Sequence, residues 1–253
     1  MFLVLEYCPC GDLGKYLEQG SFSEEVAKIY ACELILAIEY LHKNGVIYRD
    51  LKPDNILVAE NGHIKLTDYG LSKMNCSDEF NSSSFCGTFA YLAPEMISNL
   101  GYGKTLDWYC FGAVLYEFCV RRPPYYRKQK EELIQNILHG ALELPKAMNP
   151  ELKDLLVGLL DKVPTQRLGF HGAQEIKNHA FFADIDWTAF NRKNAKGGYD
   201  GVFVPRRELQ TFSKSKKKLA AQAMSSIADD PGLKPSLRLF KNIEGWNFVR
   251  DSI

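Results

Sequence analysis

The chain has 253 residues, of which 46% are hydrophobic and 12% aromatic, so it can bury a sizeable core and is not a disordered segment. Thirty-one basic residues balance thirty-one acidic ones, and this zero net charge argues against a nucleic-acid partner. No apolar stretch reaches the ~20 residues that span a membrane, and the first apolar run is too short for a signal peptide. The composition therefore predicts a cytoplasmic protein without a transmembrane segment.

The chain contains seven cysteines, and none of them forms the C-x-x-C pair that builds many zinc sites. Their number is odd, which does not suit a complete set of disulfides. We therefore expect buried thiols in a reducing compartment.

The first half of the chain predicts a strand and a long helix. The apolar run at 2–5 predicts a buried strand, and because no earlier strand can pair with it, a preceding segment is expected to be missing. An apolar helix is predicted over 24–41, with Ser23 as its N-cap and two glutamates at its positive end. Apolar residues surround most of this helix, so we expect it to be buried.

Further along, two β-type runs at 55–58 and 63–67 flank Glu60-Asn61-Gly62, which predicts a hairpin. Helical patterning returns at 105–119, 131–138 and 151–160. After residue 182 the sequence becomes polar, which predicts an extended tail and not a second core. We therefore predict a mainly α domain with one small hairpin at 1–182, and a tail at 183–253.

Three motifs carry the chemistry. Tyr48-Arg49-Asp50-Leu51-Lys52-Pro53-Asp54-Asn55 is followed, thirteen residues after Asn55, by Asp68-Tyr69-Gly70 and then by Ala93-Pro94-Glu95. Their order and spacing resemble the catalytic loop, the magnesium-binding motif and the end of the activation segment of protein kinases. The resemblance implies a protein-kinase-like C-terminal lobe that uses ATP and Mg²⁺ to phosphorylate Ser or Thr hydroxyls of protein substrates. That reaction needs positioning of the hydroxyl and neutralisation of phosphate charge.

By this resemblance, the catalytic residues are Asp50, Lys52 and Asn55. Asp50 would accept the proton of the substrate hydroxyl, and Lys52 would contact the transferred phosphoryl group. Asn55 and Asp68 would supply oxygen ligands to magnesium, a hard cation. The alternative is that the two aspartates are ordinary turn residues that bond their own backbone.

The resemblance also implies an ATP-binding surface. Backbone groups of Glu6 and Cys8 would meet the edge of the adenine, with Leu57 beneath the ring, and Asp12 would bind the ribose or a basic substrate side chain. The full set of residues implied for ATP is Leu5, Glu6, Cys8, Asp12, Leu57, Thr67 and Asp68.

Several features are similar to the AGC group of serine/threonine kinases, the relatives of the cyclic-nucleotide- and phospholipid-dependent kinases. Tyr48 stands where most kinases have histidine, and the segments at 85–88, 178–187 and 243–248 resemble the same group. Ser84 matches the phosphorylated position of the activation segment, where an upstream kinase would act and Arg49 would bind the phosphate. The alternative is that Ser84 is one serine of a flexible run.

Two further sets of residues follow from the resemblance. Glu95 and Arg167 would form a buried pair that anchors the activation segment, and Asp107 would hold the catalytic-loop backbone; the alternative for the pair is ordinary surface charge. Three acids, Asp12, Asp54 and Glu117, would bind basic residues upstream of the acceptor, because carboxylates pair well with guanidinium groups. The alternative for these acids is also surface charge.

The chain departs from the family in several places. The Gly-rich loop, the phosphate-binding lysine and its glutamate partner belong upstream of Met1, so most of the N-terminal β lobe is expected to be missing. We therefore expect the chain alone to be weak or inactive. Phe89-Ala90 replaces the usual Pro-Glu, and Asn247 occupies a usual phosphorylation position. A non-catalytic docking module derived from a kinase is the main alternative function, and a small-molecule kinase is disfavoured by the activation segment.

Overall fold

The computed structural model describes residues 5–74 and 89–191, which lie within one compact unit of the chain. The predicted strand at 2–5 falls mostly outside the described residues, as do Ser84 and the tail beyond residue 191. Leu5 is described, but it is 65% exposed and belongs to no strand, because no described strand pairs with it.

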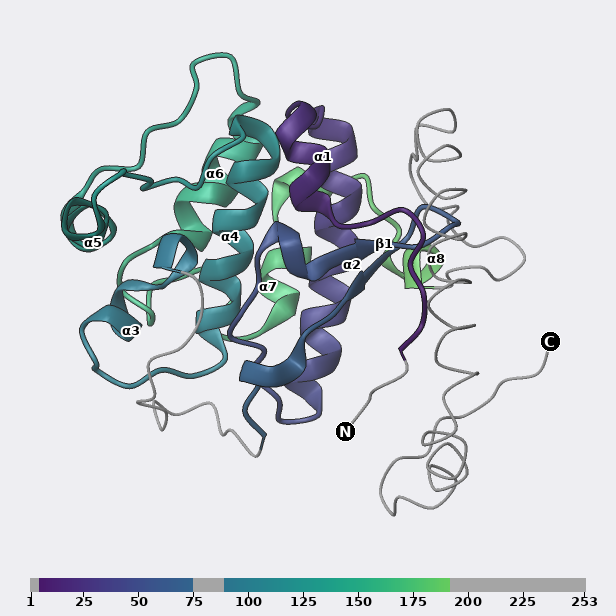
Figure 1. The fold of residues 1–253 in the computed structure, drawn as a ribbon, viewed down its shortest axis with the longest axis horizontal. Coiled ribbons are helices and arrows are strands. Elements are labelled where there is room, and N and C mark those ends of the chain that lie inside the picture. The colour runs from purple at the N-terminus through teal and green to yellow at the C-terminus, as the bar shows by residue number, and fades with distance from the viewer. Residues whose placement is uncertain (1–4, 75–88, 192–253) are drawn as a thin grey trace, which may run out of the picture. The chain divides into compact units, whose positions relative to one another are not determined.

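The centre of the domain is helix α4 (Thr105–Val120), which packs against α2 (Glu24–Lys43) and α6 (Pro150–Leu159) (Figure 1). Most of α4 is buried on every side, as its continuous apolar sequence requires. Gly112 allows α6 to approach closely, since a Cβ at this position would lie 2.8 Å from the Cβ of Leu159. A side chain at Gly112 would therefore push the two helices apart.

Helix α2 confirms the predicted helix and its N-cap, with the Ser23 hydroxyl accepting from the backbone N–H of Val26 at 3.4 Å. The helix runs to Lys43, two residues beyond the predicted end. It is not buried all round, because one stripe carries Glu25, Tyr40 and Lys43, which are exposed to solvent. The opposite face supplies much of the core.

The predicted hairpin is confirmed as β1 (Ile56–Val58) and β2 (Ile64–Leu66), which pair antiparallel with Ile56 opposite Leu66. The backbone N–H of Val58 also donates to the carbonyl of Gly11 at 2.8 Å. The hairpin therefore joins the segment before α1 (Leu13–Gln19) to the body of the domain.

The remaining described elements are short, which agrees with the predicted mainly helical domain. They are the helices α3 (Pro94–Ile97), α5 (Lys130–His139), α7 (Ala173–Lys177) and α8 (Trp187–Asn191), and the 3-10 turns η1 (Pro53–Asn55), η2 (Tyr69–Leu71), η3 (Phe89–Tyr91) and η4 (Ala180–Phe182). The Trp187 ring packs edge-on against Phe182 at 5.6 Å. Ordered packing therefore continues past residue 182, and the predicted division there stays a prediction.

The five described cysteines are free thiols. Cys10, Cys32 and Cys110 are buried, as expected, and burial raises the pKa of the Cys110 thiol. Cys8 and Cys119 are half-buried. None of the described helices is long and apolar enough to cross a membrane.

Buried tyrosines predict a loss of stability at alkaline pH. Burial raises the pKa of the buried tyrosines Tyr30, Tyr48, Tyr109, Tyr116 and Tyr125, the last to about 12, and also that of the half-buried Tyr91. In the unfolded chain these hydroxyls ionise near pH 10, whereas in the folded chain they stay protonated. The free energy of unfolding should therefore fall above about pH 10, by about 1.4 kcal/mol per pH unit for each tyrosine.

Urea unfolding between about pH 8 and pH 11 measures this fall. A free energy of unfolding that stays constant across this interval would contradict the assigned burial of the tyrosines.

Candidate active site

The catalytic-loop motif lies between α2 and the hairpin, and its backbone is held by Asp107 in the first turn of α4. Asp107 is fully buried; its Oδ2 accepts from the backbone N–H of Tyr48 and its Oδ1 from that of Arg49, both at 2.9 Å. His42 Nε2 lies 2.7 Å from the same Oδ2. Arg49 has a φ of 73°, a conformation that is rare for residues other than glycine. The two hydrogen bonds to Asp107 hold the backbone around this strained residue.

The structure brings together the three residues predicted to be catalytic. Asp50 is only 6% exposed, and its Oδ2 accepts from Asn55 Nδ2 at 2.9 Å. The same amide nitrogen donates to the Asp50 carbonyl at 2.9 Å. Lys52 Nζ lies 3.0 Å from Asp50 Oδ2. The Asp50 carboxylate is therefore fixed by an amide and an ammonium group from its own loop.

Tyr48 links this loop to the Asp68 motif. Its hydroxyl donates to the carbonyl of Thr67, and its ring packs edge-on against Tyr69 at 5.4 Å. Thr67 in turn donates its backbone N–H to the carbonyl of Asn55 at 3.0 Å. The predicted residues Asn55, Thr67 and Asp68 therefore lie at the open end of the hairpin.

Asp68 has a left-handed backbone with a φ of 57°, and its Oδ1 accepts from the N–H of Gly70 at 3.2 Å. Because Asn55 directs its amide nitrogen to Asp50, its amide oxygen is the atom that can face a cation. One carboxylate and one amide oxygen suit Mg²⁺, which usually takes one or two protein carboxylates together with substrate phosphates. The donor set therefore fits the metal implied by the motif.

Five of the residues predicted to bind the nucleotide lie along the segment before α1 and on β1, while Thr67 and Asp68 follow β2. Asp12 forms an antiparallel bridge with Leu57, so these two are neighbours. The Glu6 carboxylate pairs with Lys65 on β2 at 2.6 Å, while Leu5 is exposed and Cys8 half-buried. Asp12 also caps α1, accepting from the N–H of Lys15 at 3.0 Å and pairing with its ammonium. Lys15 belongs to none of the predicted sets of residues, although its spacing of three residues from Asp12 is typical of an N-cap pair.

Two of the three predicted substrate-binding acids, Asp12 and Asp54, lie beside Gly14 in the first turn of α1. A Cβ on Gly14 would lie 3.2 Å from an oxygen of Asp54 and 3.3 Å from one of Asp12. Glu117 accepts from the Tyr91 hydroxyl at 2.5 Å. Burial, with a smaller effect from the charge of Asp54, raises the pKa of Glu117. Tyr91 belongs to none of the predicted sets of residues.

Glu95 and Arg167 form a bidentate pair in the interior, 3% and 1% exposed respectively. The two guanidinium nitrogens donate to the two carboxylate oxygens at 2.6 and 2.9 Å. Arg167 also donates to the carbonyls of Thr105 at 3.1 Å and Asp161 at 3.0 Å. The Tyr109 ring centroid lies 4.9 Å from the guanidinium carbon. This burial excludes the alternative of ordinary surface charges.

Arg49, the predicted phosphate contact, has acceptors within the protein. Its Nε donates to the carbonyl of Leu71, and its Nη1 donates to the Tyr102 hydroxyl at 2.8 Å. Ser84 lies outside the described residues, so a contact between the two stays a prediction.

A second buried pair, Glu33 with His63, was missed by the sequence analysis. His63 Nδ1 lies 2.6 Å from Glu33 Oε1, and Glu33 Oε2 accepts from the backbone N–H of Ile64 at 2.8 Å. Glu33 is 1% and His63 5% exposed. The pair ties the closed end of the hairpin to α2, while the open end carries Asn55 and Asp68. The sequence feature that could have indicated this pair is Glu33 itself, an acid within the apolar run of α2.

Replacing Glu33 with Gln should lower the free energy of unfolding by about 2 kcal/mol, because the amide has one acceptor oxygen where the buried carboxylate uses two. Glu25→Gln on the exposed stripe of the same helix is the matched control and should change it by less than about 0.5 kcal/mol. Urea unfolding of both variants measures the difference. Equal free energies of unfolding for the Glu33→Gln and Glu25→Gln variants would show that the buried pair does not stabilise the fold.

Comparison with known proteins shows the family of the chain. A model of the protein kinase domain matches residues 1–182, and the chain belongs to the protein kinase family. The chain is 47% identical over 99% of its length to serine/threonine-protein kinase gad8 of Schizosaccharomyces pombe. It is 39% identical over 99% to serine/threonine-protein kinase YPK2/YKR2 of Saccharomyces cerevisiae, and 37% identical over 100% to human ribosomal protein S6 kinase alpha-6.

Within the family, the chain is a member of the AGC group of serine/threonine kinases, which confirms the resemblance noted in the catalytic loop and tail. The matches span 43%, 36% and 33% of those three relatives, so the chain spans about a third to two fifths of their length.

Proposed function

We propose that the chain transfers the γ-phosphoryl group of ATP to Ser or Thr hydroxyls of protein substrates. The observation that carries this proposal is the Asp50 carboxylate, which is held by Asn55 and Lys52 at 2.9 and 3.0 Å in a loop anchored to α4. A carboxylate fixed in this way can orient an acceptor hydroxyl and take its proton.

In this proposal Asp50 acts as the base, and Lys52 neutralises charge on the transferred group. Asn55 keeps the Asp50 carboxylate in one orientation, because its amide nitrogen donates to both the side chain and the carbonyl of Asp50. Tyr48 joins the base to the metal-binding end of the hairpin through the Thr67 carbonyl. Positioning of this kind supplies much of the catalytic effect in phosphoryl transfer.

Protein kinases use ATP with Mg²⁺, and in this chain Asn55 and Asp68 would hold the metal, which neutralises phosphate charge when bound. Leu57 would lie against the adenine, and the backbone of Glu6 and Cys8 would meet its edge. Leu5 and Thr67 would complete this surface, and Asp12 would bond the ribose. Phosphorylation of Ser84 by an upstream kinase, with Arg49 receiving the phosphate, would regulate the site.

We propose further that the acidic group at Asp12, Asp54 and Glu117 favours substrates with basic residues upstream of the acceptor. A serine peptide with two arginines before the acceptor should be phosphorylated with a KM at least about fivefold lower than the same peptide with glutamines. The transfer of labelled phosphate from ATP measures both peptides.

The same assay tests the proposed function itself. The product should be phosphoserine, and removal of Mg²⁺ with EDTA should abolish its formation. If the two peptides react equally, the basic preference is wrong while the phosphotransfer stands. Because weak or no activity is expected of the chain alone, the assay is also run with the chain joined to the N-terminal β lobe of a related kinase; if no phosphoserine forms there with either peptide, the proposed function is contradicted.

A further inference from the structure

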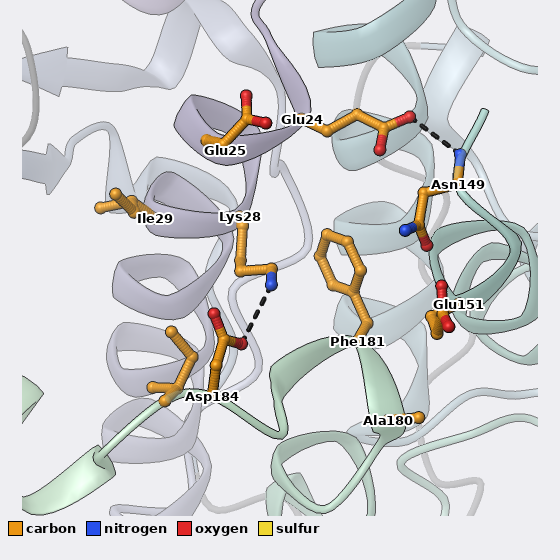
Figure 2. Close-up of a pocket in the computed structure, with 10 residues that line it drawn as sticks. Glu24, Glu25, Lys28, Ile29, Asn149, Glu151, Ala180, Phe181 and Asp184 are labelled. Atoms are coloured by element: carbon orange, nitrogen blue, oxygen red, sulfur yellow. Dashed lines mark hydrogen bonds and ion pairs between the residues drawn. The ribbon is translucent and has the colours of Figure 1, made fainter. Parts of the chain in front are cut away.

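A pocket of about 470 Å³ lies at the start of α2, where three parts of the chain meet (Figure 2). Its walls are the first turns of α2, the start of α6, and the segment that runs from η4 to Ile185. Asp50 follows the other end of α2, which has 20 residues and is therefore about 30 Å long. The pocket is thus distinct from the candidate active site.

The lining of this pocket is strongly acidic. It contains four carboxylates, on Glu24, Glu25, Glu151 and Asp184, and one ammonium group, on Lys28, which leaves three negative charges. Each wall contributes at least one acid, and Figure 2 shows these carboxylates around the pocket with Lys28 and Phe181 between them.

Two of the acids have partners across the pocket, and these contacts fix its shape. Glu24 Oε1 accepts from the backbone N–H of Asn149 at 3.0 Å, which joins α2 to α6. Lys28 Nζ pairs with Asp184 at 3.0 Å, which joins α2 to the segment after η4. Glu25 and Glu151, on opposite walls, are exposed to solvent. Glu25 also hydrogen-bonds with Ser23 in its own helix start, but it has no partner across the pocket, so both exposed carboxylates can receive an incoming group.

The chemistry of the walls excludes an anionic ligand. Helix starts often bind anions, but here the N-cap side chains of Ser23 and Asn149 already accept from the N–H groups of Val26 and Leu152. A single metal ion is also unsuited, because Glu24 and Asp184 already have partners and the other two carboxylates, Glu25 and Glu151, lie on opposite walls. Negative charge spread over three walls suits an extended ligand with cationic groups.

The pocket already holds one cation of the protein's own. The Lys28 ammonium lies 4.8 Å from the centroid of the Phe181 ring while it pairs with Asp184. Ile29 and Ile185 add half-buried apolar surface. Lysine and arginine side chains match such a lining, because their apolar stems pack on hydrocarbon while their charged heads reach carboxylates.

We propose that this pocket docks a lysine- or arginine-bearing segment of a protein partner. Charge complementarity with Glu25 and Glu151 selects the segment, and the apolar wall receives the side-chain stems. A peptide that follows the length of α2 from a segment docked here toward the loop of Asp50 covers about 30 Å, which takes at least about nine residues of extended chain. The docking does not depend on phosphotransfer, so it is measured as binding.

The probe is a fluorescein-labelled peptide of about ten residues in which arginine and leucine alternate, followed by fluorescence anisotropy in about 0.05 M salt. The double variant Glu25→Gln, Glu151→Gln should bind it at least about fivefold more weakly than the unchanged chain. The matched control is Glu131→Gln, Glu132→Gln, which removes two exposed first-turn acids from α5 and should leave the affinity unchanged.

A third arm separates the pocket from the acids near the active site. The Asp54→Asn variant should keep at least half of the anisotropy change that the peptide gives with the unchanged chain. A peptide with glutamine in place of arginine should not bind. The proposal is overturned if the pocket variant binds as tightly as the unchanged chain, if the α5 control weakens binding equally, or if Asp54→Asn alone abolishes it. Matching thermal melts of the variants show that each is folded.

Discussion

Replacing Arg167 with methionine is expected to lower the free energy of unfolding by about 3–5 kcal/mol, because it leaves Glu95 as a buried charge without its partner. Arg167 is 1% exposed and makes a bidentate pair with Glu95 at 2.6 and 2.9 Å. It also donates to the carbonyls of Thr105 and Asp161, which would lose their partner as well. Urea unfolding of the variant and the unchanged chain measures the loss.

The double variant Glu95→Gln, Arg167→Met separates the unpaired charge from the loss of packing. It should recover part of the stability that Arg167→Met loses, because no buried charge is left alone. Lys153→Met on α6, where Lys153 is half-buried and donates to the Lys146 carbonyl at 2.8 Å, serves as a control for loss of a cation and should change stability by less than about 1 kcal/mol. A similar effect of Arg167→Met and Lys153→Met would contradict the assigned role of the pair.

The second large effect is expected on catalysis, where Asp50→Asn should lower the rate of phosphate transfer by about 10²–10⁴-fold. An amide of the same shape cannot take the proton of the acceptor hydroxyl. The variant also changes the hydrogen bond from Asn55 and removes the ion pair with Lys52. The effect should appear in kcat more than in KM, since the proton transfer belongs to the chemical step.

Much of the fold could be predicted from the sequence because its signals are local. The turn residues Glu60-Asn61-Gly62 and the N-cap Ser23 act within a few residues, and the structure has the predicted hairpin and helix start. The prediction that α2 is buried all round was wrong. It rested on the many apolar residues of the helix, but Glu25 and Tyr40 lie on a stripe that is exposed to solvent.

The candidate site depends on contacts that local patterns do not contain. Glu95 and Arg167 are 72 residues apart in sequence, and the pair was predicted from family resemblance alone. Glu33 and His63, 30 residues apart, belong to no motif and were missed. Tertiary packing decides such partnerships, so a buried acid in an apolar helix signals only that some partner must exist.

The acidic pocket was missed for the same reason. Its walls come from α2, α6 and the segment after η4, more than a hundred residues apart at the extremes. In the sequence, Glu24 and Glu25 have a sufficient explanation as acids in the first turn of a helix. Only the fold brings Glu151 and Asp184 to the same place.

The most direct test of the proposed mechanism compares Asp50→Asn with Asp54→Asn in the same phosphorylation assay at saturating ATP and peptide. Asp50 is buried at 6% exposure, whereas Asp54, four residues later in the same loop, is exposed. We predict that kcat falls about 10²–10⁴-fold for Asp50→Asn and changes by less than about threefold for Asp54→Asn, whose effect should lie in KM. A kcat unchanged by Asp50→Asn, or lowered equally by both substitutions, would contradict the role of Asp50 as the base.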